Sequence, residues 1–133
     1  MRYLCLGYNS EKKWETMSEA ERNAFLDGCF AYDDVLRAGG HFVGGEALQS
    51  SNTATSVRLQ NGKPSVTDGP FVETKEQLGG VMILEAKDLD QAIELISRHP
   101  GISNAGFEIR PIADLSDMMR ESEKRRGVNA SPR

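Results

Sequence analysis

The chain has 133 residues, of which 38% are hydrophobic and 27% are charged, a composition typical of one globular domain with its own core. Its 16 Lys and Arg against 20 Asp and Glu give a formal net charge of −4, so we expect no nucleic-acid partner. No apolar run approaches the roughly 18 residues that span a bilayer, and the N-terminal stretch becomes polar too early for a secretory signal. We therefore expect a soluble, cytoplasmic protein without a membrane partner.

Metal and cofactor motifs are missing from the sequence. Two cysteines, Cys5 and Cys29, and two histidines, His41 and His99, lie too far apart for a local metal-ligand spacing. The glycine pairs fit neither the P-loop pattern nor the dinucleotide-binding pattern. We therefore expect no metal and no cofactor.

The N-terminal third predicts a strand and a long helix. Residues 3–8 form a short apolar and aromatic run, which is typical of a buried strand. Ser18 and Glu21 have the spacing of a capping box, so we expect a helix over residues 18–38 that ends at Gly39-Gly40. One face of this helix carries an apolar stripe, formed by Phe25, Cys29, Tyr32, Val35 and Leu36.

The middle of the chain predicts a β-hairpin. Residues 41–49 hold a glycine pair and indicate a short, interrupted strand. Residues 53–59 are rich in β-branched side chains, and Asn61-Gly62 tolerates the positive φ of a two-residue turn before residues 63–66.

The last part of the domain predicts strand, helix and strand. Residues 81–85 are apolar and form the next strand, and Asp88 caps a helix that stops at Pro100-Gly101. Residues 107–111 alternate apolar and polar side chains, which is the pattern of a strand with one buried face. The helical stripe consists of Leu89, Ala92, Ile93 and Ile96.

The order of elements favours an α+β protein of ferredoxin-like topology with a β-hairpin elaboration. Two helices cover one face of an antiparallel sheet, and the other face needs water or a second copy of the chain, so we expect a homodimer. The domain spans residues 1–113. Residues 114–133 are polar, with a helical turn near Leu115 to Met119, and we expect the last dozen residues to be mobile.

The least generic segment covers residues 67–80. Asp68-Gly69-Pro70 suits a rigid turn, because Gly69 tolerates unusual dihedral angles and the following proline fixes φ. Phe71 is expected to be a buried anchor. Residues 74–77 repeat the capping-box spacing, so we predict a single helical turn that ends at Gly79.

Several segments together resemble the YCII-related proteins of the DGPF subgroup, and the likeness covers residues 1–113. The segments are GEALQ at 45–49, TATSVR at 53–58, VTDGPFVETKEQLGG at 66–80, DLDQAIEL at 88–95 and EIRPI at 108–112. The resemblance implies a dimeric α/β-barrel in which paired sheets enclose a cleft. Most such relatives have no assigned reaction, some are encoded beside or fused to extracytoplasmic-function sigma factors, and a more distant relative is a dehydrochlorinase of a chlorinated hydroxyquinol.

The chain departs from its wider superfamily at one position. The resemblance implies a His-Asp pair with the histidine on the first helix, but residues 18–38 contain no histidine. Asp33 and Asp34 are the late acidic residues of that helix, and His99 is interpreted as a structural residue at a helix end. The proposed pair is therefore not carried over to this chain.

The site candidates follow from side-chain chemistry. Asp68 could act as a general base or hold a cation, or it could only build the turn. His41 could do acid-base work near neutral pH, or it could be a surface residue. Arg58 and Arg110, if they share a face, could bind a carboxylate or phosphate, and Glu73, which could pair with either arginine, joins them as a ligand-binding candidate.

Two functions remain open. The first is an enzyme or small-molecule binder, a homodimer whose cleft near the DGPF loop holds a small polar or anionic ligand. The second is a non-catalytic interaction or accessory module associated with transcription regulation, such as a sigma-factor partner. The sequence predicts the fold in much more detail than the reaction.

Overall fold

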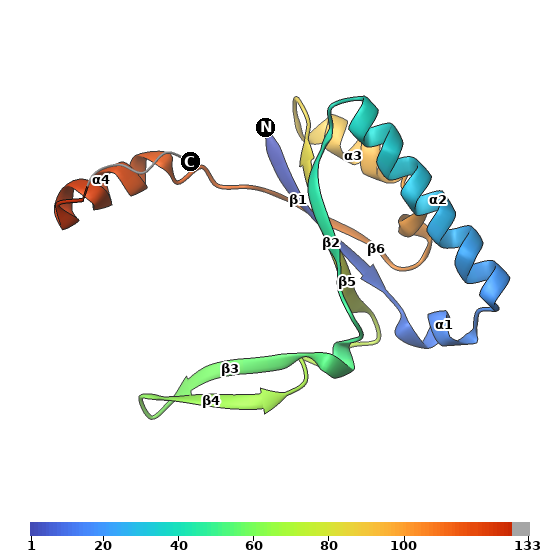
Figure 1. Cartoon of the computed structure of the whole chain (residues 1–133), viewed down its shortest axis with the longest axis horizontal. Coiled ribbons are helices and arrows are strands. Elements are labelled where there is room, and N and C mark those ends of the chain that lie inside the picture. The colour runs from blue at the N-terminus through green and yellow to red at the C-terminus, as the bar shows by residue number, and fades with distance from the viewer. Residues whose placement is uncertain (129–133) are drawn as a thin grey trace.

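The computed structural model describes residues 1–128, which form an antiparallel sheet with two helices on one face and two projecting segments (Figure 1). The main sheet has the strand order β2-β5-β1-β6, and every neighbouring pair is antiparallel. Its strands are β1 (Arg2–Asn9), β2 (Phe42–Ala47), β5 (Gln77–Glu85) and β6 (Gly106–Pro111). With a helix after β1 and another after β5, this is the βαββαβ arrangement of ferredoxin-like domains, as the sequence predicted.

Two helices, α2 (Glu19–Ala38) and α3 (Leu89–Ser97), cover one face of the sheet. The Ser18 hydroxyl accepts the Glu21 N–H and the Glu21 side chain accepts the Ser18 N–H, so the predicted capping box is confirmed. Asp88 caps α3 by accepting the Gln91 N–H, also as predicted. A short helix that the sequence did not predict, α1 (Glu11–Thr16), precedes α2.

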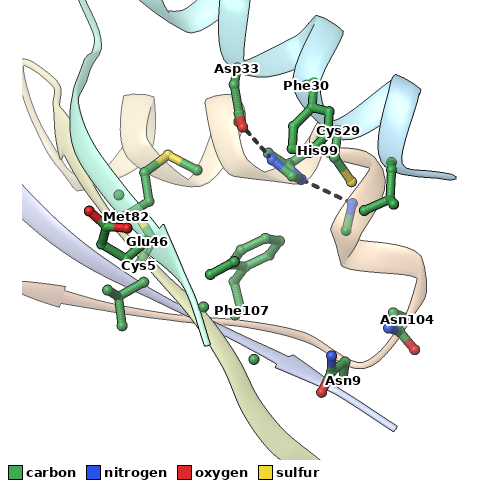
Figure 2. A pocket seen from close by; sticks show the side chains of 18 of the residues that line it. Cys5, Asn9, Cys29, Phe30, Asp33, Glu46, Met82, His99, Asn104 and Phe107 are labelled. Atoms are coloured by element: carbon green, nitrogen blue, oxygen red, sulfur yellow. Dashed lines mark hydrogen bonds and ion pairs between the residues drawn. The ribbon is translucent and has the colours of Figure 1, made fainter. Parts of the chain in front are cut away.

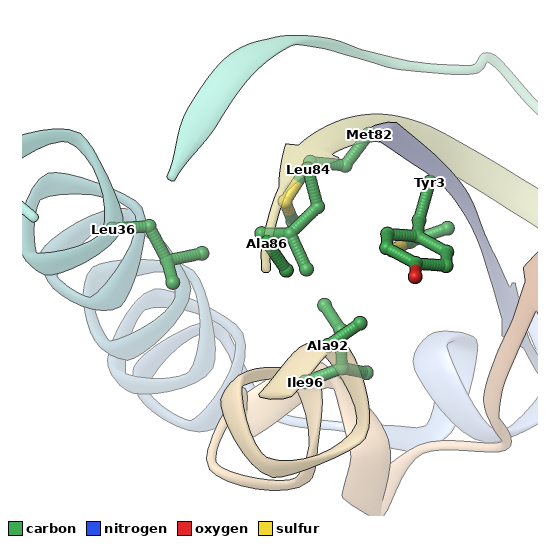
Figure 3. Close-up of a cluster of buried hydrophobic side chains, with 8 residues drawn as sticks. Tyr3, Leu36, Met82, Leu84, Ala86, Ala92 and Ile96 are labelled. Carbon is green, nitrogen blue, oxygen red and sulfur yellow. The ribbon is translucent and has the colours of Figure 1, made fainter. Parts of the chain in front are cut away.

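The core lies between the sheet and the two helices (Figure 3). Alternate residues of β1 and β5 face the helices, because successive side chains of a strand point to opposite sides. The Tyr32 hydroxyl donates to the Leu95 carbonyl at 2.5 Å and so ties α2 to α3. The buried cluster consists of Tyr3, Cys5, Leu36, Met82, Leu84, Ala86, Ala92 and Ile96.

The predicted hairpin is confirmed. It pairs β3 (Thr55–Gln60) with β4 (Lys63–Asp68) in a sheet of its own and extends away from the helix-covered side (Figure 1). Asn61 and Gly62 both have positive φ, at 53° and 77°, which suits the right-handed twist of the strands. Val57 lies opposite Val66, and both side chains are exposed in the single chain.

Two expectations for residues 67–80 are wrong. Residues 74–77 form no helical turn, because β5 begins at Gln77 and its ladder with β1 continues to the Asn9–Gln77 pair. Gly79 therefore lies within a strand and ends no helix. Phe71 is 62% exposed in the single chain, and the Arg58 guanidinium lies 4.2 Å from the centre of its ring.

The C-terminal tail is more helical than predicted. Instead of one turn it forms α4 (Ser116–Arg126), which ends at Gly127 with φ of 67°. The helix stands apart from the sheet, on the same side as the hairpin (Figure 1). The expectation that the last dozen residues are mobile stays a prediction, and residues 129–133 of that segment lie outside the described residues.

The second face of the main sheet carries aliphatic side chains. Leu4 pairs with Ile83 and Leu6 with Val81, and strand alternation turns these four residues away from the helices. No helix of residues 1–128 packs on this face (Figure 1). Within the same residues, no helix has the length and apolar character needed to cross a membrane.

Candidate functional site

A cavity of about 390 Å³ lies between the sheet and α2 (Figure 2). It begins where the core ends, because the helix-facing positions that follow Cys5 on β1 and precede Met82 on β5 are Gly7 and Gly80. These two glycines pair across the strands and contribute no side chains. The cavity is thus a direct result of two missing side chains in an otherwise packed layer.

The cavity has the size and lining of a small-molecule site. Binding pockets for small molecules measure roughly 300–1,000 Å³ and combine apolar walls with a few polar groups. Its aromatic walls come from Phe25, Phe30, Phe42 and Phe107. Its polar groups are Asn9, Asp33, Arg37, Glu46, His99 and Asn104.

A histidine-carboxylate pair lies in this cavity. His99 Nε2 is 3.1 Å from Asp33 Oδ1, and the two side chains are 9% and 20% exposed (Figure 2). Asp33 comes from α2, and His99 immediately precedes the short helix η2 (Pro100–Ser103). The pair therefore joins two elements that are distant in sequence at the wall of the cavity.

The hydrogen bonds of His99 define which nitrogen carries the proton. The Gly101 N–H donates to Nδ1 at 3.0 Å, so Nδ1 is the acceptor and the ring hydrogen of the neutral form belongs to Nε2. Nε2–H then donates to Asp33. Both ring nitrogens are thus occupied by protein partners, and Asp33 is the more exposed side chain of the pair.

Packing fixes the position of the His99 ring. Its centroid is 5.6 Å from that of Tyr32 and 5.2 Å from that of Phe107, in both cases edge to face. A Cβ on Gly101 would lie 3.0 Å from Nδ1 and 3.2 Å from Phe107 Cζ. A glycine is required at this position for the ring to approach the turn so closely.

The sequence reasoning missed this pair. His99 was interpreted as structural, and it does cap η2, but its contact with the cavity was not predicted. A signal was present on the helix: Asp33 lies four residues after Cys29 and three before Leu36, so a carboxylate interrupts the buried stripe. A charged side chain on a buried face needs a partner, and His99 supplies it.

Both cysteines line the cavity as protonated thiols. Burial raises the pKa of Cys5 to about 11. Burial and then the charge of Asp33 also raise the pKa of Cys29, although the Gly101 N–H opposes the shift. The thiols are therefore poor nucleophiles near neutral pH.

Comparison with known proteins identifies the family. The YCII-related domain matches residues 1–116. The chain belongs to the YCII-related family. This YCII-related protein is 31% identical over 117 residues to the uncharacterized protein R00369 of Rhizobium meliloti (strain 1021). The alignment covers 85% of this chain and 93% of that protein.

A solved structure confirms the fold of this YCII-related protein. It is 5-chloro-2-hydroxyhydroquinone dehydrochlorinase (TftG) from Burkholderia phenoliruptrix AC1100, in complex with 2,5-dihydroxybenzoquinone. The TM-score is 0.51 at 15% sequence identity, and the match covers 85% of this chain and 94% of that chain. The similarity supports the α+β, ferredoxin-like assignment.

Two of the predicted site residues lie elsewhere, in a second cavity of about 970 Å³. This cavity lies beside residues 68–71, the DGPF loop. Asp68 and Glu73 line it together with Glu11 and Glu76, and its lining includes no Lys or Arg. The Gly69 N–H donates to the Ala54 carbonyl at 2.7 Å and holds the loop. Four carboxylates disfavour the anionic ligand that the sequence suggested at this loop.

The other predicted site residues are dispersed. His41 Nδ1 lies 2.8 Å from the Glu85 carbonyl oxygen, and His41 lines neither cavity. Arg58 stacks on Phe71 in the hairpin, whereas Arg110 lies in β6 of the main sheet, 3.8 Å from the Glu108 carboxylate. The two arginines thus belong to different sheets, and a single chain does not join them into a clamp.

Proposed function

We propose that this YCII-related protein is an enzyme that binds a small ring-shaped organic molecule between the sheet and α2 and removes a proton from it. The observation that carries this proposal is the His99–Asp33 pair at the wall of an aromatic cavity. The site therefore differs from the cleft near the DGPF loop that the sequence favoured.

Asp33 is the group that accepts the proton. Neutral His99 would have to receive a proton on Nδ1, where the Gly101 N–H already donates, so its protonation would break the cap of η2. A carboxylate keeps a second oxygen for a substrate proton while His99 Nε2–H holds the first. In this arrangement His99 is a positioning residue and Asp33 is the general base.

The apolar lining favours an aromatic or quinone-like ring as ligand. Flat rings pack well on the edges and faces of phenylalanine side chains. The solved relative is named a dehydrochlorinase and was bound to a quinone, and loss of HCl requires a proton as well as chloride to leave the substrate. Removal of a proton from a hydroxylated ring is therefore the reaction class that we test first.

The experiment compares wild-type protein with Asp33→Asn and, as a matched control, Asp27→Asn, which changes an exposed carboxylate of α2 outside the cavity lining. The probes are 2,5-dihydroxybenzoquinone for binding and 5-chloro-2-hydroxyhydroquinone for chloride release. We expect Asp33→Asn to lower the rate by about 100-fold or more, because a general base contributes that much, and Asp27→Asn to leave it unchanged. Wild-type protein that binds neither compound, or full activity of Asp33→Asn, would contradict the proposal.

We also propose that the active form is a homodimer that closes over the aliphatic sheet face. Leu4, Leu6, Val81 and Ile83 form a row on that face, and the hairpin and α4 extend from the same side (Figure 1). A second copy would cover this row and would give the projecting segments a packing partner. An accessory role beside a transcription regulator remains the alternative if no ring compound binds.

A further inference from the structure

We propose that Asn9 binds a second oxygen substituent of the ring, at the end of the cavity away from Asp33. The ligand class is then a ring that carries hydrogen-bonding oxygens at two positions, one for the carboxylate and one for the amide. This inference rests on the proposed function, because it concerns the same cavity. Figure 2 shows Asn9 at the opposite end of the cavity from Asp33, with Asn104 beside it.

The first observation is an unpartnered polar atom. Asn9 Oδ1 is buried, with less than 1 Å² exposed, and it has no hydrogen-bond partner among residues 1–128. Buried side-chain oxygens are nearly always hydrogen-bonded in folded proteins, so an exception needs an explanation. Asparagine is also a poor strand residue, which makes its presence at the end of β1 harder to explain by stability.

The second observation is the position of Asn9, which lies two residues after Gly7 on the helix-facing side of β1 and opposite a β-bulge in β5. Gly7 pairs with Gly80, but Tyr8 pairs with Leu78, so Gly79 is an extra residue of β5 without a partner on β1. Bulges are frequent beside binding sites, and this one places Gly79, which has no side chain, next to the amide of Asn9. Asn9 follows this irregularity directly and lines the cavity.

The third observation is that the bulge residue must be a glycine for Asn9 to lie there. A Cβ on Gly79 would be 2.7 Å from Asn9 Nδ2, 2.9 Å from Cγ and 3.1 Å from Oδ1. Any side chain at this position would displace the amide. Gly79 thus leaves room for the Asn9 amide, whose Oδ1 accepts no hydrogen bond from the described residues.

A carboxamide suits an oxygen substituent of either kind. Its NH₂ group donates to a carbonyl or phenolate oxygen, and its oxygen accepts from a hydroxyl group, with a rotation of 180° between the two. Oδ1 is enclosed as it lies, so the amide must rotate for this oxygen to reach a ligand, and no hydrogen bond to Oδ1 from the described residues opposes that rotation. Asp33 at the other end accepts a hydroxyl proton, so a ring with two oxygens satisfies both groups.

The test measures dissociation constants for phenol and for the three dihydroxybenzenes under anaerobic conditions. The variants are wild type, Asn9→Ala and Asp33→Asn, with Asn23→Ala on the exposed surface of α2 as the matched control. We expect wild type to bind at least one dihydroxybenzene about five- to tenfold more tightly than phenol, as one additional hydrogen bond would give. Asn9→Ala should remove this preference and leave phenol binding unchanged.

The test distinguishes failure of the Asn9 assignment from failure of the proposed function. If the rings bind, Asp33→Asn weakens all of them and Asn9→Ala keeps the preference, then the Asn9 assignment is overturned and the proposed function stands. If no ring binds wild type, both the Asn9 assignment and the proposed function are contradicted. A purely structural role for Asn9 would lower the melting temperature of Asn9→Ala and leave the ratio of the two dissociation constants unchanged, which also overturns the inference.

Discussion

At the scale of single residues, His99 performs three tasks with one ring. It accepts the Gly101 N–H, donates to Asp33 and packs between Tyr32 and Phe107. A phenylalanine could reproduce the packing, but it could make neither of the two hydrogen bonds. Substitution by phenylalanine therefore measures what the two hydrogen bonds contribute together.

We therefore expect His99→Phe to lower the free energy of unfolding by about 1–3 kcal/mol, because a partly buried carboxylate and a backbone N–H lose their partners. Urea denaturation at pH 7 measures this change. His41→Phe is the comparison: the His41 side chain makes one hydrogen bond, to the Glu85 carbonyl, so its loss should lower the free energy of unfolding by less. Equal stability of His99→Phe and wild type would show that the pair contributes nothing to the fold.

At the scale of elements, Glu11 connects α1 to a neighbouring turn, the short helix η1 (Ser51–Thr53). Its carboxylate accepts the Ser51 N–H at 2.7 Å and the Ser51 hydroxyl at 2.9 Å. The backbone hydrogen bond, followed by the hydroxyl bonds, lowers the pKa of Glu11 below its usual value. A lowered pKa in the folded state means stability that is present above the unfolded pKa and is lost as pH falls through the folded one.

Glu11→Gln should therefore lower the free energy of unfolding at pH 7 by about 1 kcal/mol, a value reduced by solvent screening of the partly exposed carboxylate. At pH 3 the difference between Glu11→Gln and wild type should be smaller than at pH 7, because the wild-type carboxylate takes up a proton as pH falls through its folded-state pKa. Thermal unfolding at the two pH values measures both quantities. Glu15→Gln on the same helix is the control, and a difference that grows toward low pH would contradict the assignment.

Local signals predicted the elements well, and long-range pairing explains the misses. The Ser18 and Asp88 caps and the Asn61-Gly62 turn depend on residues within four positions, so the sequence is sufficient to predict them. The early start of β5 depends on its ladder with β1, which competes with the local capping-box spacing of residues 74–77.

The candidate site could not be predicted for the same reason. Asp33 and His99 are 66 positions apart, and nothing in their neighbouring residues indicates that they meet. The family pattern directed attention to a histidine on the first helix, whereas here the helix carries the aspartate. Asp68 and His41 remain predictions, although neither contacts the His99–Asp33 pair.

At the scale of the whole molecule, the aliphatic sheet face should decide the oligomeric state. Leu6→Glu would place an unpaired charge in the proposed interface and should weaken the dimer by about 100-fold or more. Analytical ultracentrifugation over a concentration series measures the dissociation constant. Ile93→Glu, on the exposed side of α3, is the control and should leave it unchanged. A wild-type protein that is monomeric at micromolar concentration would contradict the homodimer.

The residues that limit the size of the ligand lie on different elements from the residues proposed to react with it. Gly7 and Gly80 lie in the sheet, whereas Asp33 and His99 come from α2 and the turn after α3. A Cβ on Gly7 would approach Phe107 Cε1 to 3.0 Å, and one on Gly80 would approach the Glu46 carbonyl oxygen to 3.2 Å. Relatives that carry alanine at either position are expected to accept smaller molecules, with the proposed base Asp33 unchanged. Under the proposed function, single methyl groups on the sheet would therefore change the size of the ligand while Asp33 and His99 keep their roles.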